Sequence, residues 1–315
     1  MAVAFMLFAF IGCGAGAEFS PELPPVRTAQ PSVSGSLATA TPAALPEPVA
    51  SSEPVAAPEP VVETVEPEPK PAVTVETLGY SRQGVAIRMH TFGRSGPTTL
   101  IFGGIHGNEP ASKAVAVALV KHLTAEPSLY RGRRVAVIPA ANPDGLKAGT
   151  RTNANGVDCN RNFPTRNWRP GRKRSVVYGG PAAASEPETR LIIQAVNNLS
   201  PVQVIALHSI TAGRECNNYD GPARSLAQLL SRHNGYKVSS DIGYPTPGSF
   251  GTWAGEERNI ASITLELPRG IDGDKAWDTN RLALISAIQR EDSARGDDDL
   301  ATAADDSQPV SPASE

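Results

Sequence analysis

The chain has 315 residues, with 29 lysines and arginines against 32 aspartates and glutamates, so its formal net charge is −3 at pH 7. This balance excludes a general nucleic-acid binder, which would carry a basic excess. Three cysteines are too few, and odd in number, for a framework of disulfides, although the sequence leaves open whether Cys159 and Cys216 pair.

The N-terminal segment, residues 1–17, has an apolar run at 2–12 that is too short to span a bilayer but suits the core of a secretion signal. No Lys or Arg precedes the run, which departs from the usual signal. The run ends in FIGC, which resembles a bacterial lipobox with Phe in place of the usual Leu. We therefore expect a secreted or periplasmic protein, with membrane anchoring through a lipid on Cys13 as one form; the alternative is a cytoplasmic protein.

Two further segments have compositions that cannot bury a core. Residues 18–73 are rich in Pro, Ala, Glu and Val, which predicts a disordered linker with extended polyproline II character. Residues 292–315 are acidic and poor in apolar side chains, which predicts a disordered tail. The remaining segment, 74–291, is long enough for one domain with a sizeable core.

Inside 74–291, short apolar segments alternate with helical patterns. Apolar runs predict buried strands at 99–105, 134–140, 202–207 and 262–267. Helices are expected at 111–123, from a capping box of Ser185 and Glu188 through Asn198, and at 277–290. Buried strands that alternate with helices predict an α/β sandwich with a largely parallel sheet.

Polar residues that can bind metal follow several of these strands. His106 and Glu109 follow 99–105, His208 follows 202–207, and Glu266 lies near the end of 262–267. Sites in open α/β sheets form outside the carboxyl ends of the strands, so we expect these side chains to meet. Two histidines and one carboxylate leave a fourth position open for water, as in catalytic zinc sites. A glutamate between two leucines in an apolar strand needs a partner or a catalytic purpose.

Six motifs occur in the order seen in M14 zinc carboxypeptidases: GGIHGNEP, NPDG, GVDCNRNFP, ALHS, YPTPGSFGTW and TLELP. The resemblance covers residues 76–290, and GYPTPGSFG and PAAASEPET resemble the murein peptide amidase branch of that family. It implies the zinc-carboxypeptidase-like α/β/α sandwich with a mixed, largely parallel central sheet. It also implies one Zn²⁺ per chain, held by His106, Glu109 and His208, with Glu266 as the general base.

The resemblance also implies how substrate is bound. Asn160 and Arg161 resemble the pair that holds the terminal carboxylate, and Arg151 resembles the arginine that stabilises the oxyanion. Tyr244 resembles the tyrosine that closes over substrate. Relatives set side-chain preference seven positions later; here that residue is Gly251, which predicts a roomy, neutral pocket.

The implied function is hydrolysis of the γ-D-glutamyl–diaminopimelate bond of murein peptides. One alternative is a metallocarboxypeptidase that acts on L-amino-acid C-termini. Another is an N-acyl amino acid deacylase of the succinylglutamate desuccinylase and aspartoacylase kind, against which the full YPTPGSFGTW segment argues. A zinc-free cell-wall binding module would require decayed ligands, and all four key positions are intact. The basic cluster at 166–174 is either a solvated surface or an attraction for anionic cell-wall peptides.

Overall fold

The computed structural model describes residues 73–291. The predicted signal segment 1–17, the linker up to residue 72 and the acidic tail 292–315 lie outside these residues. No helix within 73–291 is long and apolar enough to cross a membrane.

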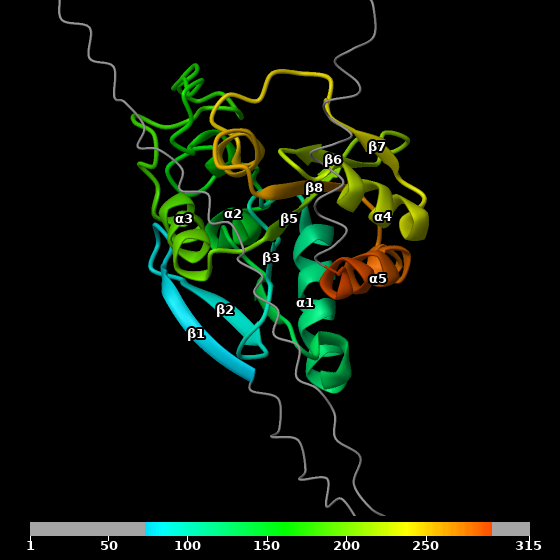
Figure 1. Cartoon of the computed structure of the whole chain (residues 1–315). Helices are drawn as coiled ribbons and strands as arrows, with labels where there is room; N and C mark the ends of the chain where they lie inside the picture. Colours follow the sequence, from blue (N-terminus) through cyan, green and yellow to red (C-terminus); the bar gives the residue numbers. More distant parts are fainter. Residues whose placement is uncertain (1–72, 292–315) are drawn as a thin grey trace, which may run out of the picture. The chain divides into compact units, whose positions relative to one another are not determined.

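A mixed eight-stranded sheet forms the centre of the described residues, in the order β1-β2-β4-β3-β5-β8-β6-β7 (Figure 1). Strands β4, β3, β5 and β8 run parallel to one another, and β2 and β6 join this group antiparallel. The strands are β1 (Val73–Tyr80), β2 (Ala86–Phe92), β3 (Thr98–Phe102), β4 (Arg134–Ile138), β5 (Gln203–Ile210), β6 (Cys216–Asp220), β7 (Lys237–Ser239) and β8 (Ala261–Pro268).

Helices cover both faces of this sheet (Figure 1). They are α1 (Pro110–Ala125), α2 (Pro143–Ala148), α3 (Pro187–Leu199), α4 (Arg224–Asn234) and α5 (Gly273–Gln289), with a π-helical turn at Thr252–Glu256. Helices α1, α4 and α5 share one buried apolar cluster with the sheet, and α3 and the π-helical turn share another. The result is an α/β/α sandwich.

The central strands are apolar on both sides because each side meets a helical layer. In β3 every residue is buried, with Ile101 in the cluster of α1 and Leu100 and Phe102 in the cluster of α3. This two-sided burial explains why the central strands read as continuous apolar runs. It also leaves the strand ends, rather than the strand faces, as the place for polar side chains.

The structure confirms the predicted central strands and helices, with ends shifted by a few residues. The hairpin β1–β2 and the strands β6 and β7 were not predicted. The predicted capping box at Ser185 and Glu188 is wrong. The helix N-cap is Glu186, the Ser185 hydroxyl donates to the Glu186 carboxylate, and Glu188 instead accepts from the side chain of Asn153.

Candidate metal centre and active site

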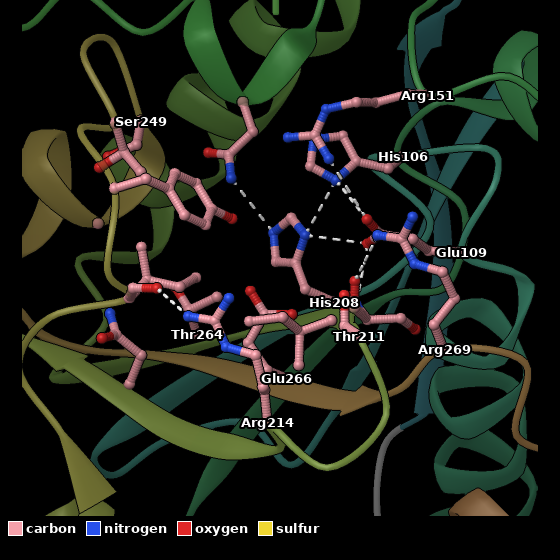
Figure 2. Close-up of a pocket in the computed structure, with 18 of the residues that line it drawn as sticks. His106, Glu109, Arg151, His208, Thr211, Arg214, Ser249, Thr264, Glu266 and Arg269 are labelled. Carbon is pink, nitrogen blue, oxygen red and sulfur yellow. Dashed lines mark hydrogen bonds and ion pairs between the residues drawn. The ribbon is translucent and has the colours of Figure 1, made fainter. Parts of the chain in front are cut away.

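Four side chains converge at the carboxyl ends of three strands, β3, β5 and β8 (Figure 2). His106 and Glu109 lie between β3 and α1, His208 lies within β5, and Glu266 lies within β8. His208 and Glu266 are partners in the parallel β5–β8 register. The structure therefore brings together all four residues predicted from the strand ends.

The segment that carries His106 is held in place by the NPDG motif. The side-chain amide of Asn142 donates to the carbonyl of Ile105 at 3.1 Å. Gly107 passes so close to the backbone of Gly145 that a Cβ at position 107 would overlap it. Glycine at 107 is therefore required for this close approach, which fixes the segment between β3 and α1 against the start of α2.

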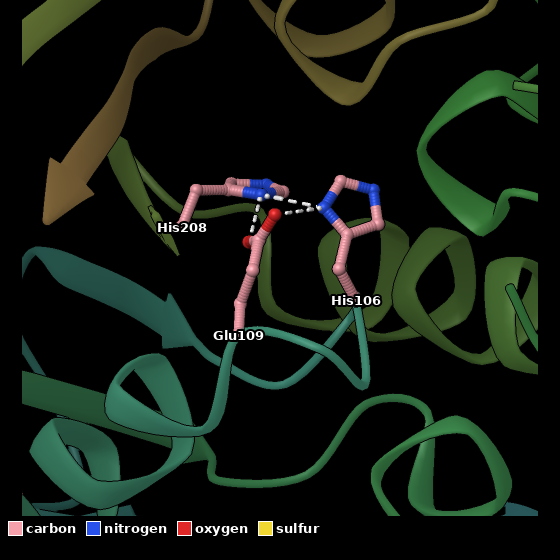
Figure 3. A group of neighbouring side chains, drawn as sticks. All are labelled: His106, Glu109 and His208. Atoms are coloured by element: carbon pink, nitrogen blue, oxygen red, sulfur yellow. Dashed lines mark hydrogen bonds and ion pairs between the residues drawn. The ribbon is translucent and has the colours of Figure 1, made fainter. Parts of the chain in front are cut away.

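Three of the four side chains form a group that could hold a metal ion (Figure 3). The Nδ1 of His106 lies 3.0 Å from Oε1 of Glu109, and the Nδ1 of His208 lies 3.2 Å from Oε2 of Glu109. The two Nδ1 atoms are 3.1 Å apart, and each of the three residues is 2% exposed. Two imidazoles and one carboxylate aimed at a common point form the donor set of a catalytic zinc site.

An outer carboxylate, Asp158, orients His106. Its Oδ1 lies 3.0 Å from Nε2 of His106, and its Oδ2 accepts from Nε of Arg151 at 2.8 Å. Burial alone would lower the pKa of His106, but the charges of Glu109 and Asp158 outweigh it and raise that pKa. A carboxylate behind a ligating imidazole fixes the ring and its tautomer, so that Nδ1 is left to face the metal position.

The protonation states of the other two ligand residues suit a metal. Burial opposes ionisation of Glu109, but His106 and His208 hold its pKa well below the usual value. Burial lowers the pKa of His208. An ionised carboxylate and a neutral imidazole are the forms that bind a cation, so these residues fit a divalent metal ion.

Glu266 is a buried acid beside this group. Its Oε2 has no hydrogen-bond partner within residues 73–291, and the side chain is 5% exposed. Burial is the main cause that raises the pKa of Glu266 to about 8, and the charge of Glu109 adds to it. An unpaired carboxylate oxygen at this place is available to exchange a proton with a molecule in the cavity.

A cavity of about 250 Å³ opens beside these residues and is lined by the other predicted site residues, Arg151, Asn160, Arg161 and Tyr244. Arg161 is 5% exposed, and its Nη1 donates to the carbonyl of Asn160 at 2.7 Å. Burial lowers the pKa of the Arg161 guanidinium, although it remains a cation. Tyr244 is 45% exposed at the cavity mouth.

The prediction of a neutral pocket at Gly251 is wrong, because an acidic side chain lines the cavity there. The carboxylate of Asp220, from β6, lies against Gly251 where a Cβ of any other residue would stand. Sequence reasoning missed this carboxylate because β6 was not predicted. It also missed Asp158, although an acid inside the GVDCNRNFP motif was a usable signal.

Other open questions from the sequence have structural answers. Cys159 and Cys216 are free and buried, so they do not pair. In the basic loop, Arg166 is 86% exposed and lies 3.7 Å from Glu257. Of the basic residues in this loop, only Arg169 lines a second cavity.

The second cavity, about 550 Å³, adjoins the first and shares Arg151, Arg161, Tyr244 and Arg269 with it. Its remaining lining residues are Asn108, Arg169, Gly171, Val176, Val177, Pro245 and Pro247. The lining thus contains four arginines and, among the described residues, no acid, so it favours an anion with apolar neighbours.

Comparison with known families and proteins agrees with this geometry. The family model described as zinc carboxypeptidase matches residues 61–276. Murein peptide amidase A of Escherichia coli K12 is 35% identical over 201 residues, which cover 60% of this chain and 78% of that protein. Murein peptide amidase A of Vibrio campbellii is 36% identical over 207 residues, which cover 61% of this chain and 77% of that protein.

Solved structures show the same fold. The crystal structure of murein-tripeptide amidase MpaA from Escherichia coli O157 aligns with a TM-score of 0.57 at 30% identity, over 69% of this chain and 92% of that chain. Bovine thrombin-activatable fibrinolysis inhibitor aligns with a TM-score of 0.61 at 19% identity, over 73% of this chain and 91% of that chain, and shows the fold alone.

Proposed function

The chain belongs to the zinc carboxypeptidase family and is a zinc metallopeptidase; from this premise we propose that it hydrolyses the γ-D-glutamyl–diaminopimelate bond of murein peptides. The observation that carries the proposal is the convergence of two Nδ1 atoms and a carboxylate beside the unpaired oxygen of Glu266. Zn²⁺ held by His106, Glu109 and His208 would supply Lewis acidity, which polarises a carbonyl group and lowers the pKa of water.

The residues of the chain divide the remaining work. Glu266 accepts a proton from the attacking water and gives it to the leaving amine. Arg151 lies 3.5 Å from Glu109 and donates to Asp158. It would present a fixed cation to the negative charge that develops on the carbonyl oxygen. Because two carboxylates already hold this guanidinium, it needs little reorganisation during the reaction.

The leaving amino acid would lie in the smaller cavity. Its terminal carboxylate would pair with Arg161, a buried guanidinium without a carboxylate partner among residues 73–291, and with the side chain of Asn160. Tyr244, at the mouth, would close over it. A free carboxylate on the leaving residue is thus the first requirement for a substrate.

The acyl part would lie in the larger cavity. A γ-linked D-glutamate keeps its α-carboxylate free, unlike a residue in an ordinary peptide. Arg169 and Arg269 line this cavity and suit such an extra anion. This feature favours the murein peptide over an ordinary peptide substrate.

A metallocarboxypeptidase that acts on ordinary L-amino-acid C-termini is the second candidate. The Arg161 site would serve it equally well. The catalytic chain of carboxypeptidase N from Rattus norvegicus is 30% identical over 265 residues, which cover 62% of this chain and 57% of that protein. A deacylase of the aspartoacylase kind remains the third candidate.

One experiment separates these candidates. The purified full chain is incubated with murein tripeptide, with a C-terminal dipeptide and with N-acetyl-aspartate, with and without chelator, and mass spectrometry identifies the products. Chelator-sensitive release of diaminopimelate from the tripeptide supports the proposal. Cleavage of the dipeptide alone supports the carboxypeptidase, and cleavage of N-acetyl-aspartate alone supports the deacylase. Cleavage that is insensitive to chelator contradicts a metal-dependent reaction.

We also propose that the chain is exported and that Cys13 carries a lipid, since residues 2–13 resemble a lipoprotein signal and the proposed substrate belongs to the cell wall. Expression of the wild type and of Cys13→Ser with labelled fatty acid tests this. Label on the wild type alone supports anchoring. A cytoplasmic, unlabelled chain contradicts it.

A further inference from the structure

The side chain of the leaving amino acid would lie in the smaller cavity, which is called the side-chain cavity below. This cavity is also lined by polar groups that the reaction itself does not use. In the antiparallel β6–β8 pairing, Asn218 faces Thr264 and Cys216 faces Glu266. Side chains alternate along a strand, so Asn218 and Asp220 project from the same face of the sheet as Glu266. All three line the cavity.

Among residues 73–291, two acceptor groups that line this cavity receive no hydrogen bond. The Oδ1 of Asn218 is buried and has no hydrogen-bond partner within residues 73–291, and the whole side chain is 7% exposed. The half-buried carboxylate of Asp220 rests on Gly251, which offers no polar side chain to it. Burial, aided by the charge of Glu256, raises the pKa of Asp220 to about 7. Unpaired acceptors in such a place require a ligand that donates hydrogen bonds.

A cation, Arg214, also lines this cavity. Arg214 lies in the turn between β5 and β6, and its Nη2 donates to the carbonyl of Ile242 at 3.2 Å. Figure 2 labels it among the residues that line the cavity. Within residues 73–291 it has no carboxylate within ion-pair distance, and it is exposed enough to reorient its remaining N–H groups. The cavity therefore offers both an acid and a cation to a bound side chain.

We propose that Asp220 and Asn218 bind the distal ammonium group, and Arg214 the distal carboxylate, of a zwitterionic side chain on the leaving amino acid, as in diaminopimelate. The inference rests on the proposed function for the identity of the leaving residue. The Arg161 site would meanwhile hold the carboxylate next to the scissile bond, so the two carboxylates of the leaving residue are bound by different arginines.

The energetics favour this assignment over an apolar or simply basic side chain. An apolar side chain would leave the acceptors of Asp220 and Asn218 unpaired and desolvated. A lysine side chain would satisfy them but would leave Arg214 without an anion. Sites built from buried polar groups discriminate strongly against ligands that lack the matching group.

The test uses the full zinc-loaded chain and four substrates, L-Ala-γ-D-Glu-X. X is meso-diaminopimelate, L-lysine, L-2-aminopimelate, which lacks only the distal ammonium, or L-norleucine, which lacks both distal groups. The kcat/KM of each substrate is measured for the wild type, Asp220→Asn and Arg214→Gln. Asp278→Asn controls for loss of an exposed carboxylate away from the cavity, and Arg172→Gln controls for loss of a loop arginine outside the cavity.

We expect the wild type to have its highest kcat/KM with the diaminopimelate substrate. Asp220→Asn should reduce the preference for diaminopimelate over 2-aminopimelate by about 10-fold or more. Arg214→Gln should reduce the preference for diaminopimelate over lysine by a similar factor, and the control variants should keep both preferences. Unchanged preferences in both test variants, or an equal loss on all four substrates, would overturn it.

A second series separates this inference from the proposed function. The same four residues are offered as benzoyl-glycyl-X, and the free amino acids are titrated calorimetrically into the zinc-loaded chain. If only this series is cleaved and the preferences persist, the murein bond assignment fails while the side-chain assignment stands. Free amino acids that bind with no preference for diaminopimelate would contradict the side-chain assignment whether or not any bond is cleaved.

Discussion

His208 and Glu266 face one another across the parallel strands β5 and β8, so the imidazole of a candidate metal ligand and an unpaired carboxylate leave the sheet side by side. Hydrogen bonding between the two strands fixes this relationship through eight consecutive residue pairs. The position of Glu266 relative to His208 is therefore a property of the sheet, whereas Arg151, Arg161 and Tyr244 lie outside the strands.

Glu266→Gln keeps the shape of the side chain and removes its ability to take a proton. We expect kcat to fall by about 10²- to 10⁴-fold, the usual contribution of a general base. Zinc content, measured by atomic absorption, should stay at the wild-type value because the three ligands are unchanged. Retention of more than a tenth of the wild-type kcat would exclude Glu266 as the base.

Asp158→Asn removes the carboxylate behind His106 and leaves the ligands in place. We expect zinc affinity, measured by competition with a chromogenic chelator, to fall by about 10- to 100-fold. Asp278→Asn, an exposed change on α5, is the matched control. Equal zinc affinities in the two variants would contradict an orienting role for Asp158.

The preference for diaminopimelate over 2-aminopimelate should depend on pH. Burial raises the pKa of Asp220 to about 7, with Glu256 adding to the shift, so the carboxyl is largely protonated below that pH and cannot pair with an ammonium. The ratio of the two kcat/KM values should therefore rise between pH 5.5 and pH 8.5 (about a unit and a half either side of that pKa). Titrations common to both substrates cancel in this ratio, and Asp220→Asn should flatten it.

Amidation of the α-carboxylate of the D-glutamyl residue should weaken catalysis. The larger cavity presents Arg169 and Arg269 without acidic neighbours, so a neutral amide loses a charge-assisted contact. We expect kcat/KM for the amidated tripeptide to fall by about 10-fold. Arg169→Gln should narrow the difference between the two substrates, and Arg172→Gln should leave it unchanged. Equal rates for both substrates in the wild type would place the acyl group elsewhere.

Gly251→Ala should change the selectivity for the leaving amino acid while the chain still folds. The new Cβ would stand where the Asp220 carboxylate now lies, so that carboxylate must move. We expect the preference for diaminopimelate over 2-aminopimelate to fall, with a loss of stability of about 1–3 kcal/mol from overpacking. Ser249→Ala, at a position that also lines the cavity, controls for small changes in its wall. An unaltered preference would show that the Asp220 carboxylate can move aside without losing its effect on selectivity.

Much of the fold was predictable because its centre obeys a simple pattern. Strands β3, β4, β5 and β8 are apolar on both faces, and the polar residues at their ends stand out in the sequence. The three candidate metal ligands and Glu266 could be found for that reason.

The rest required tertiary information. Strand β6, with the sequence CNNYD, has no apolar run because its polar side chains line a cavity rather than a core. Asp220 could not be assigned without it. The capping box failed for a related reason: Glu188 is buried and accepts from the amide of Asn153 and from the backbone N–H of Arg82, which outcompetes a local cap.

Two different parts of the chain shape the side-chain cavity. Asp220, in β6, supplies its carboxylate, and Gly251, in the segment before β8, leaves the space that this carboxylate occupies. An acid introduced at 251 alone would collide with the one already present, and loss of Asp220 alone would leave an uncharged gap beside a glycine. A lineage that adapts this scaffold to another leaving group must therefore alter both positions together. Such a change could leave the candidate metal ligands and Glu266 unaltered.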